Sequence, residues 1–399
     1  MLEKTLREAR LTSNHHLAHS GPLVFISAAE PSADLHGAAL IRATRAFDPS
    51  VRFVGVGGPK MVEAGCERIF DMSSHAAMLL GVARNAARGI AMLNTCDHHL
   101  RAYPFAAAVV IDSPMLHLPL AAKAQAAGVP VLYYIAPQMW AWGKYRIHKL
   151  RNRTDRVAVI LPFEEDFFRN EGVNATYVGH PLAEQFSEIS VDREGVSSIQ
   201  RRGVPVVALL PGSRKHVVES VLPGQLEVAE RIASAIPGAT FGVSVANAQV
   251  ARIAAKLAAS CRVPVELYSG SHSELIQAAD LVLVASGTTT LEVAFHERPM
   301  IVMYNSSRFF YHAIGRWMID ARFLSLPNIL AGREIVPEFM PYYTSIEPIA
   351  DRAIALLRSN ELRKNMADEL AKTVAPLRSS HAAQRTAELL LEMIQSSRH

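Results

Sequence analysis

Short apolar segments of strand length alternate along the chain with longer segments of helical periodicity. In the first half, the segments that we predict to be strands are Leu23–Ser27, Arg52–Gly55, Ala106–Ile111, Val131–Ile135 and Val157–Leu161. In the second half, they are Val206–Leu210, Thr240–Val245, Val265–Tyr268, Leu281–Ala285 and Met300–Tyr304. The clearest helical segments between them are Asp34–Ala46, Leu222–Ala235 and Ala248–Ala259. This alternation predicts parallel sheets joined by crossover helices.

The two sets of strands predict two domains. A chain of 399 residues is too long for one ordinary core and fits two domains of about 150–200 residues. The chain turns polar between Asp192 and Gly203, which we interpret as a linker. We therefore predict an α/β protein of two Rossmann-like, doubly wound domains that face a cleft. The predicted parts are an N-terminal extension 1–20, a first domain 21–200, a second domain 201–345 and a helical C-terminal segment 346–399.

Composition and charge narrow the class of protein. Half of the residues are hydrophobic and a fifth are charged, which is normal for a folded chain and unlike a disordered one. The formal net charge of +4 is too small to indicate nucleic-acid binding, but it suits a surface that meets anionic lipid or phosphate. The first 20 residues lack the apolar core of a signal peptide, and no apolar run approaches the roughly 18 residues that span a bilayer. We expect a cytoplasmic protein that meets a membrane only peripherally.

Missing motifs exclude several kinds of site. The three cysteines are far apart and form no CxxC pair, which indicates free thiols in a reducing compartment. There is no HExxH motif and no Cys/His cluster, so we expect no metal site. The segment Gly55–Gly58 does not complete GxGxxG, and neither GxxxxGKS/T nor GxSxG occurs. These absences disfavour a dinucleotide-binding protein, a P-loop ATPase and an α/β-hydrolase, and we expect no cofactor.

The loop ASGTTTLE, after the fourth strand of the second half, is the most informative candidate site. Gly287 permits a tight turn and close approach of the backbone to a ligand, and the threonines present hydroxyl and amide groups suited to a diphosphate. Glu292 lies one turn into the next helix, where its carboxylate can accept hydrogen bonds from ribose hydroxyls. The alternative is that Thr289-x-x-Glu292 is only a capping box. We favour a ligand site, because a cap does not require the preceding Ser286, Gly287 and Thr288.

A second loop of this kind, LPGSRK, follows the first strand of the second half. Ser213 offers backbone and hydroxyl donors, and the guanidinium of Arg214 suits phosphate. Alone, the loop is equally consistent with an ordinary turn whose basic residues face water. Two such loops in one domain favour a nucleotide diphosphate site.

The first half has carboxylates at the ends of two predicted strands. Glu30 and Asp34 lie at a loop-to-helix junction, where acidic residues also occur because they complement the helix dipole. Asp112 closes the strand Ala106–Ile111 and is a candidate general base, although it is equally consistent with a residue that only hydrogen-bonds the next loop. The aromatic segment Tyr133–Trp142 suits contact with a sugar or an acyl chain, or a buried cluster.

Seven motifs resemble, in their order along the chain, those of the lipid-A-disaccharide synthases, which are glycosyltransferases of GT-B architecture. They are FVGVGGPKM (53–61), APQMWAW (136–142), LPFEEDFF (161–168), VGHPLAE (178–184), LLPGSR (209–214), ASGTTTLE (285–292) and SLPNILAGRE (325–334). Each motif is weak alone, but all seven in the family's order are specific. The resemblance runs from about Leu23 to the region after Glu338.

The resemblance implies a reaction and a set of site residues. The donor would be UDP-2,3-diacylglucosamine, the acceptor 2,3-diacylglucosamine 1-phosphate, and the products the β-1′,6-linked disaccharide phosphate and UDP, without a metal. Asp112 would be the general base and Glu292 the ribose-binding carboxylate. The other implied substrate-binding residues are Glu30, Ser32, Ser213, Arg214, Ser286, Gly287, Thr288, Thr289 and Asn328. The family's C-terminal segment packs back on the first domain and can exchange between subunits, which implies a possible homodimer.

The departures from the family's pattern all fall in the first half. Ala29, Pro31 and Ala33 replace two glycines and an alanine of the family's opening loop. Met115 stands where a second carboxylate often follows, and Arg84 lies near a usual glutamate. Three alternatives therefore stay open: a UDP-sugar transferase with another acceptor, a non-catalytic nucleotide-sugar-binding protein, and a UDP-sugar 2-epimerase.

Overall fold

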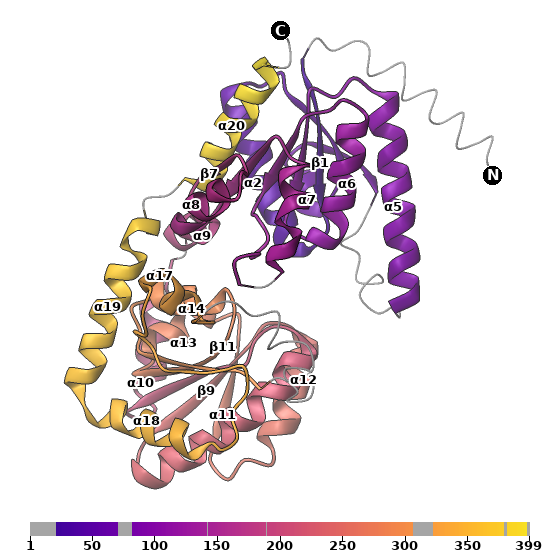
Figure 1. Cartoon of the computed structure of the whole chain (residues 1–399). Coiled ribbons are helices and arrows are strands. Elements are labelled where there is room, and N and C mark those ends of the chain that lie inside the picture. The colour runs from indigo at the N-terminus through magenta and orange to yellow at the C-terminus, as the bar shows by residue number, and fades with distance from the viewer. Residues whose placement is uncertain are drawn as a thin grey trace. The chain divides into compact units, whose positions relative to one another are not determined.

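The computed structural model describes residues 21–70, 82–141, 143–188, 190–305, 322–378 and 381–396. They fall into two compact units (Figure 1). The first unit contains the described residues up to Met139, then Lys144–Pro181 and the last helix, which begins after His381. The second unit contains the described residues of Trp140–Gly143 and Leu182–Ser380.

The first unit is built on a sheet of seven parallel strands in the order β3-β2-β1-β4-β5-β6-β7. The strands are β1 (Leu23–Ala28), β2 (Arg52–Val56), β3 (Cys66–Phe70), β4 (Ala107–Ile111), β5 (Val131–Tyr134), β6 (Arg156–Val159) and β7 (Ala175–Tyr177). The helices are α2 (Pro31–Phe47), α3 (Pro59–Glu63), α5 (Val82–Ala102), α6 (Pro114–Ala126), α7 (Ile147–Arg151), α8 (Pro162–Asn170) and α20 (Ala382–Ser396), with a 3-10 turn, η1 (Lys144–Arg146). Core residues of α5 and α6 pack on one face of the sheet, and those of α2 and α20 on the other. The central strands are therefore buried on both faces.

The second unit is built on a sheet of six parallel strands in the order β10-β9-β8-β11-β12-β13. The strands are β8 (Val206–Leu210), β9 (Thr240–Val245), β10 (Val265–Ser269), β11 (Leu281–Ala285), β12 (Met300–Met303) and β13 (Glu338–Phe339). The helices are α9 (Pro181–Glu188), α10 (Arg193–Gln200), α11 (Lys215–Ala235), α12 (Ala248–Ala258), α13 (His272–Ala278), α14 (Thr289–Phe295), α17 (Leu326–Ala331), α18 (Glu347–Arg358) and α19 (Asn360–Arg378). The prediction of an α/β fold with two doubly wound sheets is confirmed.

The structure differs from the predicted division at two places. The polar segment 192–203 is not a bare linker, because it contains α10, which packs on α13 in the second unit. The N-terminus of α10 is capped by Asp192, whose carboxylate accepts hydrogen bonds from the amides of Glu194 and Gly195 at 3.0 and 3.1 Å. The segment 346–399 is also not one part, since α18 and α19 belong to the second unit and α20 alone packs on the first. Its amphipathic spacing predicted helices without indicating which core each would cover.

Three buried polar side chains meet where β4 ends. The Nδ1 atom of His117 lies 2.7 Å from the carbonyl oxygen of Asp112, and its Nε2 atom lies 2.9 Å from Oγ of Ser27. The hydroxyl of Tyr133 donates to the same carbonyl at 2.6 Å. Burial lowers the pKa of His117 from 6.5 to about 4, so the ring is neutral. Because a carbonyl only accepts, Nδ1 carries the proton and Nε2 accepts from Ser27.

We expect His117 to make the unfolding free energy depend on pH. Its folded-state pKa is below the unfolded-state value, so the unfolded chain binds the proton first as the pH falls. The stabilisation is present above pH 6.5 and is lost as the pH falls toward 4, at up to about 1.4 kcal/mol per pH unit. Urea denaturation followed by circular dichroism at pH 5 and 7.5 should show a smaller pH dependence for His117→Asn than for wild type.

The control is His148→Asn, because His148 is an exposed histidine of the same unit. It should keep the pH dependence of wild type. An unchanged pH dependence in His117→Asn and in His117→Gln would contradict a neutral buried ring.

Candidate functional site

The strand order of the first sheet reverses between β1 and β4, and ligands of doubly wound sheets bind at such a point. Asp112 and Ser113 follow β4 with φ angles of 53° and 46°, a left-handed conformation that costs about 1–3 kcal/mol for residues other than glycine. The hydrogen bonds from His117 and Tyr133 to the carbonyl of Asp112 hold this turn. The network therefore fixes the backbone that presents Asp112, which is half-buried.

The structure brings Glu30 to the same edge of the sheet. Glu30 is the exposed residue before α2, and Ser113 donates from Oγ to its Oε1 atom at 3.4 Å. Ser32 lies exposed in the first turn of α2. Asp34 has a different role, because it is buried and its carboxylate accepts hydrogen bonds from the amides that begin α3. This hydrogen bonding at the start of α3 explains why an acidic residue occurs at position 34.

In the second sheet the strand order reverses between β8 and β11, so the loops after these two strands meet at one edge. These are the two loops that the sequence predicts to bind phosphate. Gly212 and Gly287 have φ angles of 100° and 139°, which favour glycine. Arg214 immediately precedes α11, is exposed and makes no ion pair with any described residue.

The remaining predicted residues of these loops lie around the same edge. Ser213 and Thr288 are exposed, and Ser286 and Thr289 are half-buried. A Cβ atom added at Gly287 would meet no atom of the described residues within 4 Å. Among the described residues, small side chains and a turn of the backbone therefore leave this edge open.

Glu292 does not form the capping box that was the alternative interpretation. The residue before α14 is Thr288, and no side chain caps this helix. The carboxylate of Glu292 instead lies 2.9 Å from Nε2 of His272, whose Nδ1 atom lies 2.7 Å from Oγ of Ser244. Sequence reasoning missed His272 and Ser244, because SGSHSE reads as an ordinary turn before a helix.

Asn328 is placed differently from what the resemblance implies. Its side chain is fully buried. The amide nitrogen donates to the carbonyl of Val336 and to Glu338, and the amide oxygen accepts from the amides of Ile335 and Val336. Because both ends of the amide are engaged within the chain, Asn328 shapes the segment before β13 and its side chain offers no free group to a ligand.

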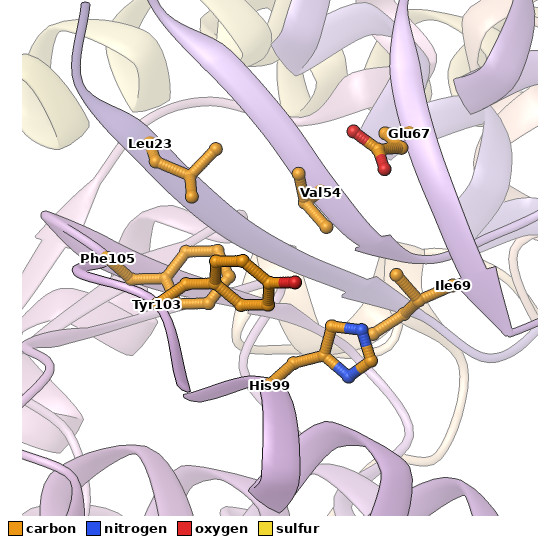
Figure 2. Close-up of a pocket in the computed structure, with 7 residues that line it drawn as sticks. All are labelled: Leu23, Val54, Glu67, Ile69, His99, Tyr103 and Phe105. Atoms are coloured by element: carbon orange, nitrogen blue, oxygen red, sulfur yellow. The ribbon is translucent and has the colours of Figure 1, made fainter. Parts of the chain in front are cut away.

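A small cavity lies elsewhere in the first unit, between the sheet and α5 (Figure 2). It measures about 40 Å³, far below the about 300–1,000 Å³ of ligand pockets. Its lining includes the first residue of β1, at the amino end of that strand, and none of the predicted site residues. The lining residues are Leu23, Val54, Glu67, Ile69, His99, Tyr103 and Phe105.

No group of three or more histidine, cysteine or acidic side chains is arranged to hold a metal ion in the described part of the chain. Within the same ranges, no helix has the length and the apolar character needed to cross a membrane. Burial raises the pKa of the Cys66 and Cys96 thiols to about 12, which makes them poor nucleophiles.

Several solved structures of other proteins have the same fold. MurG of Acinetobacter baumannii has a TM-score of 0.57 at 11% identity and covers 93% of this chain and 99% of its own. The UDP-GlcNAc 2-epimerase of Neisseria meningitidis, solved with UDP-GlcNAc, has a TM-score of 0.56 at 10% identity and covers 94% and 100%. At these identities the likeness shows the fold alone.

Sequence comparisons are more specific. The family model of lipid-A-disaccharide synthetase matches residues 24–393. The lipid-A-disaccharide synthase of Myxococcus xanthus is 35% identical over 384 residues, which are 94% of this chain and 99% of the relative. That of Syntrophus aciditrophicus is 36% identical over 378 residues, or 94% and 98%. The match spans both units, and this chain therefore belongs to the lipid-A-disaccharide synthetase family.

Proposed function

We propose that the protein is a glycosyltransferase of lipid A biosynthesis that joins two acylated glucosamine units. The donor is UDP-2,3-diacylglucosamine, the acceptor is 2,3-diacylglucosamine 1-phosphate, and the products are the disaccharide 1-phosphate and UDP. The observation that carries this proposal is the family match over residues 24–393, which includes the switch points of both sheets.

The donor site that we propose is the carboxyl edge of the second sheet. Arg214, with Ser213, faces the charge of the diphosphate, and Ser286, Gly287, Thr288 and Thr289 supply amide and hydroxyl donors. Glu292 accepts hydrogen bonds from the ribose. The support for this site is that two phosphate-type loops meet beside adjacent strands, and that Arg214 has no ion pair among the described residues.

The acceptor site that we propose is the carboxyl edge of the first sheet, with Glu30 and Ser32 as binding residues. The acceptor 6-hydroxyl attacks the anomeric carbon, the C1–O bond to the diphosphate breaks, and UDP leaves from the opposite face. Asp112 takes the hydroxyl proton. The fixed left-handed turn at Asp112 supports this role, because a general base must be held within hydrogen-bond reach of the proton that it removes.

The reaction itself is tested by UDP release from the donor with and without the acceptor. We expect release only when 2,3-diacylglucosamine 1-phosphate is present. Release only with a different acceptor would remove the lipid A assignment. Conversion of the UDP-sugar without any acceptor would instead favour a 2-epimerase.

Variants of the two edges should separate catalysis from nucleotide binding. Asp112→Asn should lower turnover by about 10²-fold or more, since it removes a general base, and should keep the affinity for UDP. Arg214→Ala should weaken UDP binding by about 10–100-fold, which corresponds to about 1.5–3 kcal/mol for a charge-assisted hydrogen bond. Turnover is measured by UDP release and affinity by calorimetry.

Matched controls for these variants are the exposed residues Asp166, in α8, and Arg352, in α18. Asp166→Asn and Arg352→Ala should behave as wild type in both measurements. Unchanged turnover in Asp112→Asn would point to a non-catalytic nucleotide-sugar-binding protein.

We also propose peripheral contact of the first unit with an anionic membrane. Tyr145 is 68% exposed in η1, and Lys149 and Arg151 are exposed in α7. An aromatic ring beside cations suits the interface of an anionic bilayer. Lys149→Ala should lower binding to phosphatidylglycerol vesicles about fivefold, or about 1 kcal/mol, in a sedimentation assay. The control is Leu362→Ala in the second unit, and equal binding to uncharged vesicles would refute the contact.

For the C-terminal segment we propose exchange between the subunits of a homodimer. α20 belongs to the first unit although α19 belongs to the second, so its docking surface on α2 can be filled by its own chain or by another copy. Sedimentation equilibrium of the full chain should give twice the single-chain mass of 43.6 kDa. A mass of one chain at micromolar concentration would exclude the dimer.

A further inference from the structure

Glu292 is the last of three polar side chains that are hydrogen-bonded in series. Ser244 lies near the end of β9, His272 is the first residue of α13, and Glu292 lies in the first turn of α14. The Ser244–His272 and His272–Glu292 distances are 2.7 and 2.9 Å. Gly270, with a φ angle of 80°, makes the tight turn after β10 that brings His272 to the start of α13. All three side chains therefore lie at the carboxyl edge of the second sheet.

The chemistry of the groups fixes the direction of one of the two contacts. An ionised carboxylate only accepts hydrogen bonds, so Nε2 of His272 donates to Oε2 of Glu292. Ser244 engages the other ring nitrogen and fixes the plane of the imidazole. Among the described residues, nothing hydrogen-bonds the second oxygen of Glu292, Oε1. One carboxylate oxygen is held while the other stays available.

The pair contributes little as a structural tie. The side chains of His272 and Glu292 are 38% and 33% exposed, and exposed ion pairs are worth about 0–1 kcal/mol. Each of the two helices is already anchored by apolar residues, such as Leu275 and Leu291, which are fully buried. The arrangement of Ser244, His272 and Glu292 is better explained by the orientation that it gives to the carboxylate of Glu292.

We propose that His272 is a positioning residue that aims Glu292 at the vicinal hydroxyls of the nucleotide ribose, with Ser244 fixing the ring. This inference rests on the proposed UDP site and adds a determinant of sugar specificity to it. With Oε2 held by His272, Oε1 accepts from a ribose hydroxyl. A nucleotide without the 2′-hydroxyl leaves this contact incomplete, so the chain Ser244–His272–Glu292 distinguishes ribose from 2′-deoxyribose.

The test is calorimetric binding of UDP and 2′-deoxy-UDP to the full chain. We expect wild type to prefer UDP, and His272→Ala to weaken UDP binding by about tenfold, as for one hydrogen bond to a charged group. Binding of 2′-deoxy-UDP should change much less, so the ratio of the two affinities falls toward one. His272→Gln, whose amide can still donate to Glu292, should recover much of the ratio. Glu292→Gln combined with His272→Ala should lose no more than either alone.

The outcomes separate this inference from the function on which it rests. If wild type does not bind UDP, the proposed function fails. If wild type binds UDP and His272→Ala keeps the wild-type ratio, the positioning role is overturned, even where both affinities fall by the same factor. His148→Ala in the first unit is the matched control and should leave both affinities unchanged.

Discussion

Burial of both faces of two parallel sheets is the constraint on which the rest of the molecule depends. The central strands β1, β4, β8 and β11 consist almost wholly of buried apolar residues, since helices cover each side. Polar chemistry is then restricted to the strand ends, where the backbone leaves the sheet. Both candidate edges lie where the strand order reverses, because only there do consecutive loops diverge and leave room for a ligand.

In each unit, one or two of the buried polar side chains lie where they control such an edge. In the first unit, His117 and Tyr133 meet the carbonyl of Asp112, which stabilises a backbone conformation that would otherwise be costly. In the second unit, Gln225 of α11 is fully buried and donates to the carbonyls of Leu210 and Leu283 at 3.5 and 2.9 Å. It thus joins β8 to β11, whose loops form the proposed diphosphate site. A buried amide nitrogen without an acceptor is costly, so the acceptors that Gln225 finds favour this arrangement of the two strands.

The sequence predicted the elements whose signal is local. Every predicted strand has a counterpart in the structure, because a run of apolar and β-branched residues between turns indicates a strand without reference to the rest of the chain. The strands β3, β7 and β13 were not predicted. β3 carries charged residues in its short run, and β7 and β13 contain only three and two residues.

The two glycine loops and Asp112 were predicted as site residues because they follow strands. His272 was not, since its partner Glu292 is 20 positions away and no spacing rule connects them. Asn328 shows the converse: a family motif identifies the residue, but not whether its side chain is already engaged.

The departures from the family's pattern near Asp112 have physical explanations that leave the turn intact. Pro31 occupies the first position of α2, where its missing amide proton removes no helical bond. Ala33 is buried in the core of the first unit. Met115 is 87% exposed, so replacing a carboxylate there removes a charge from the edge that we propose for the acceptor without disturbing the core. Because His117 and Tyr133 hydrogen-bond the carbonyl of Asp112, the exposed residues beside it can change without moving the backbone that carries the carboxylate.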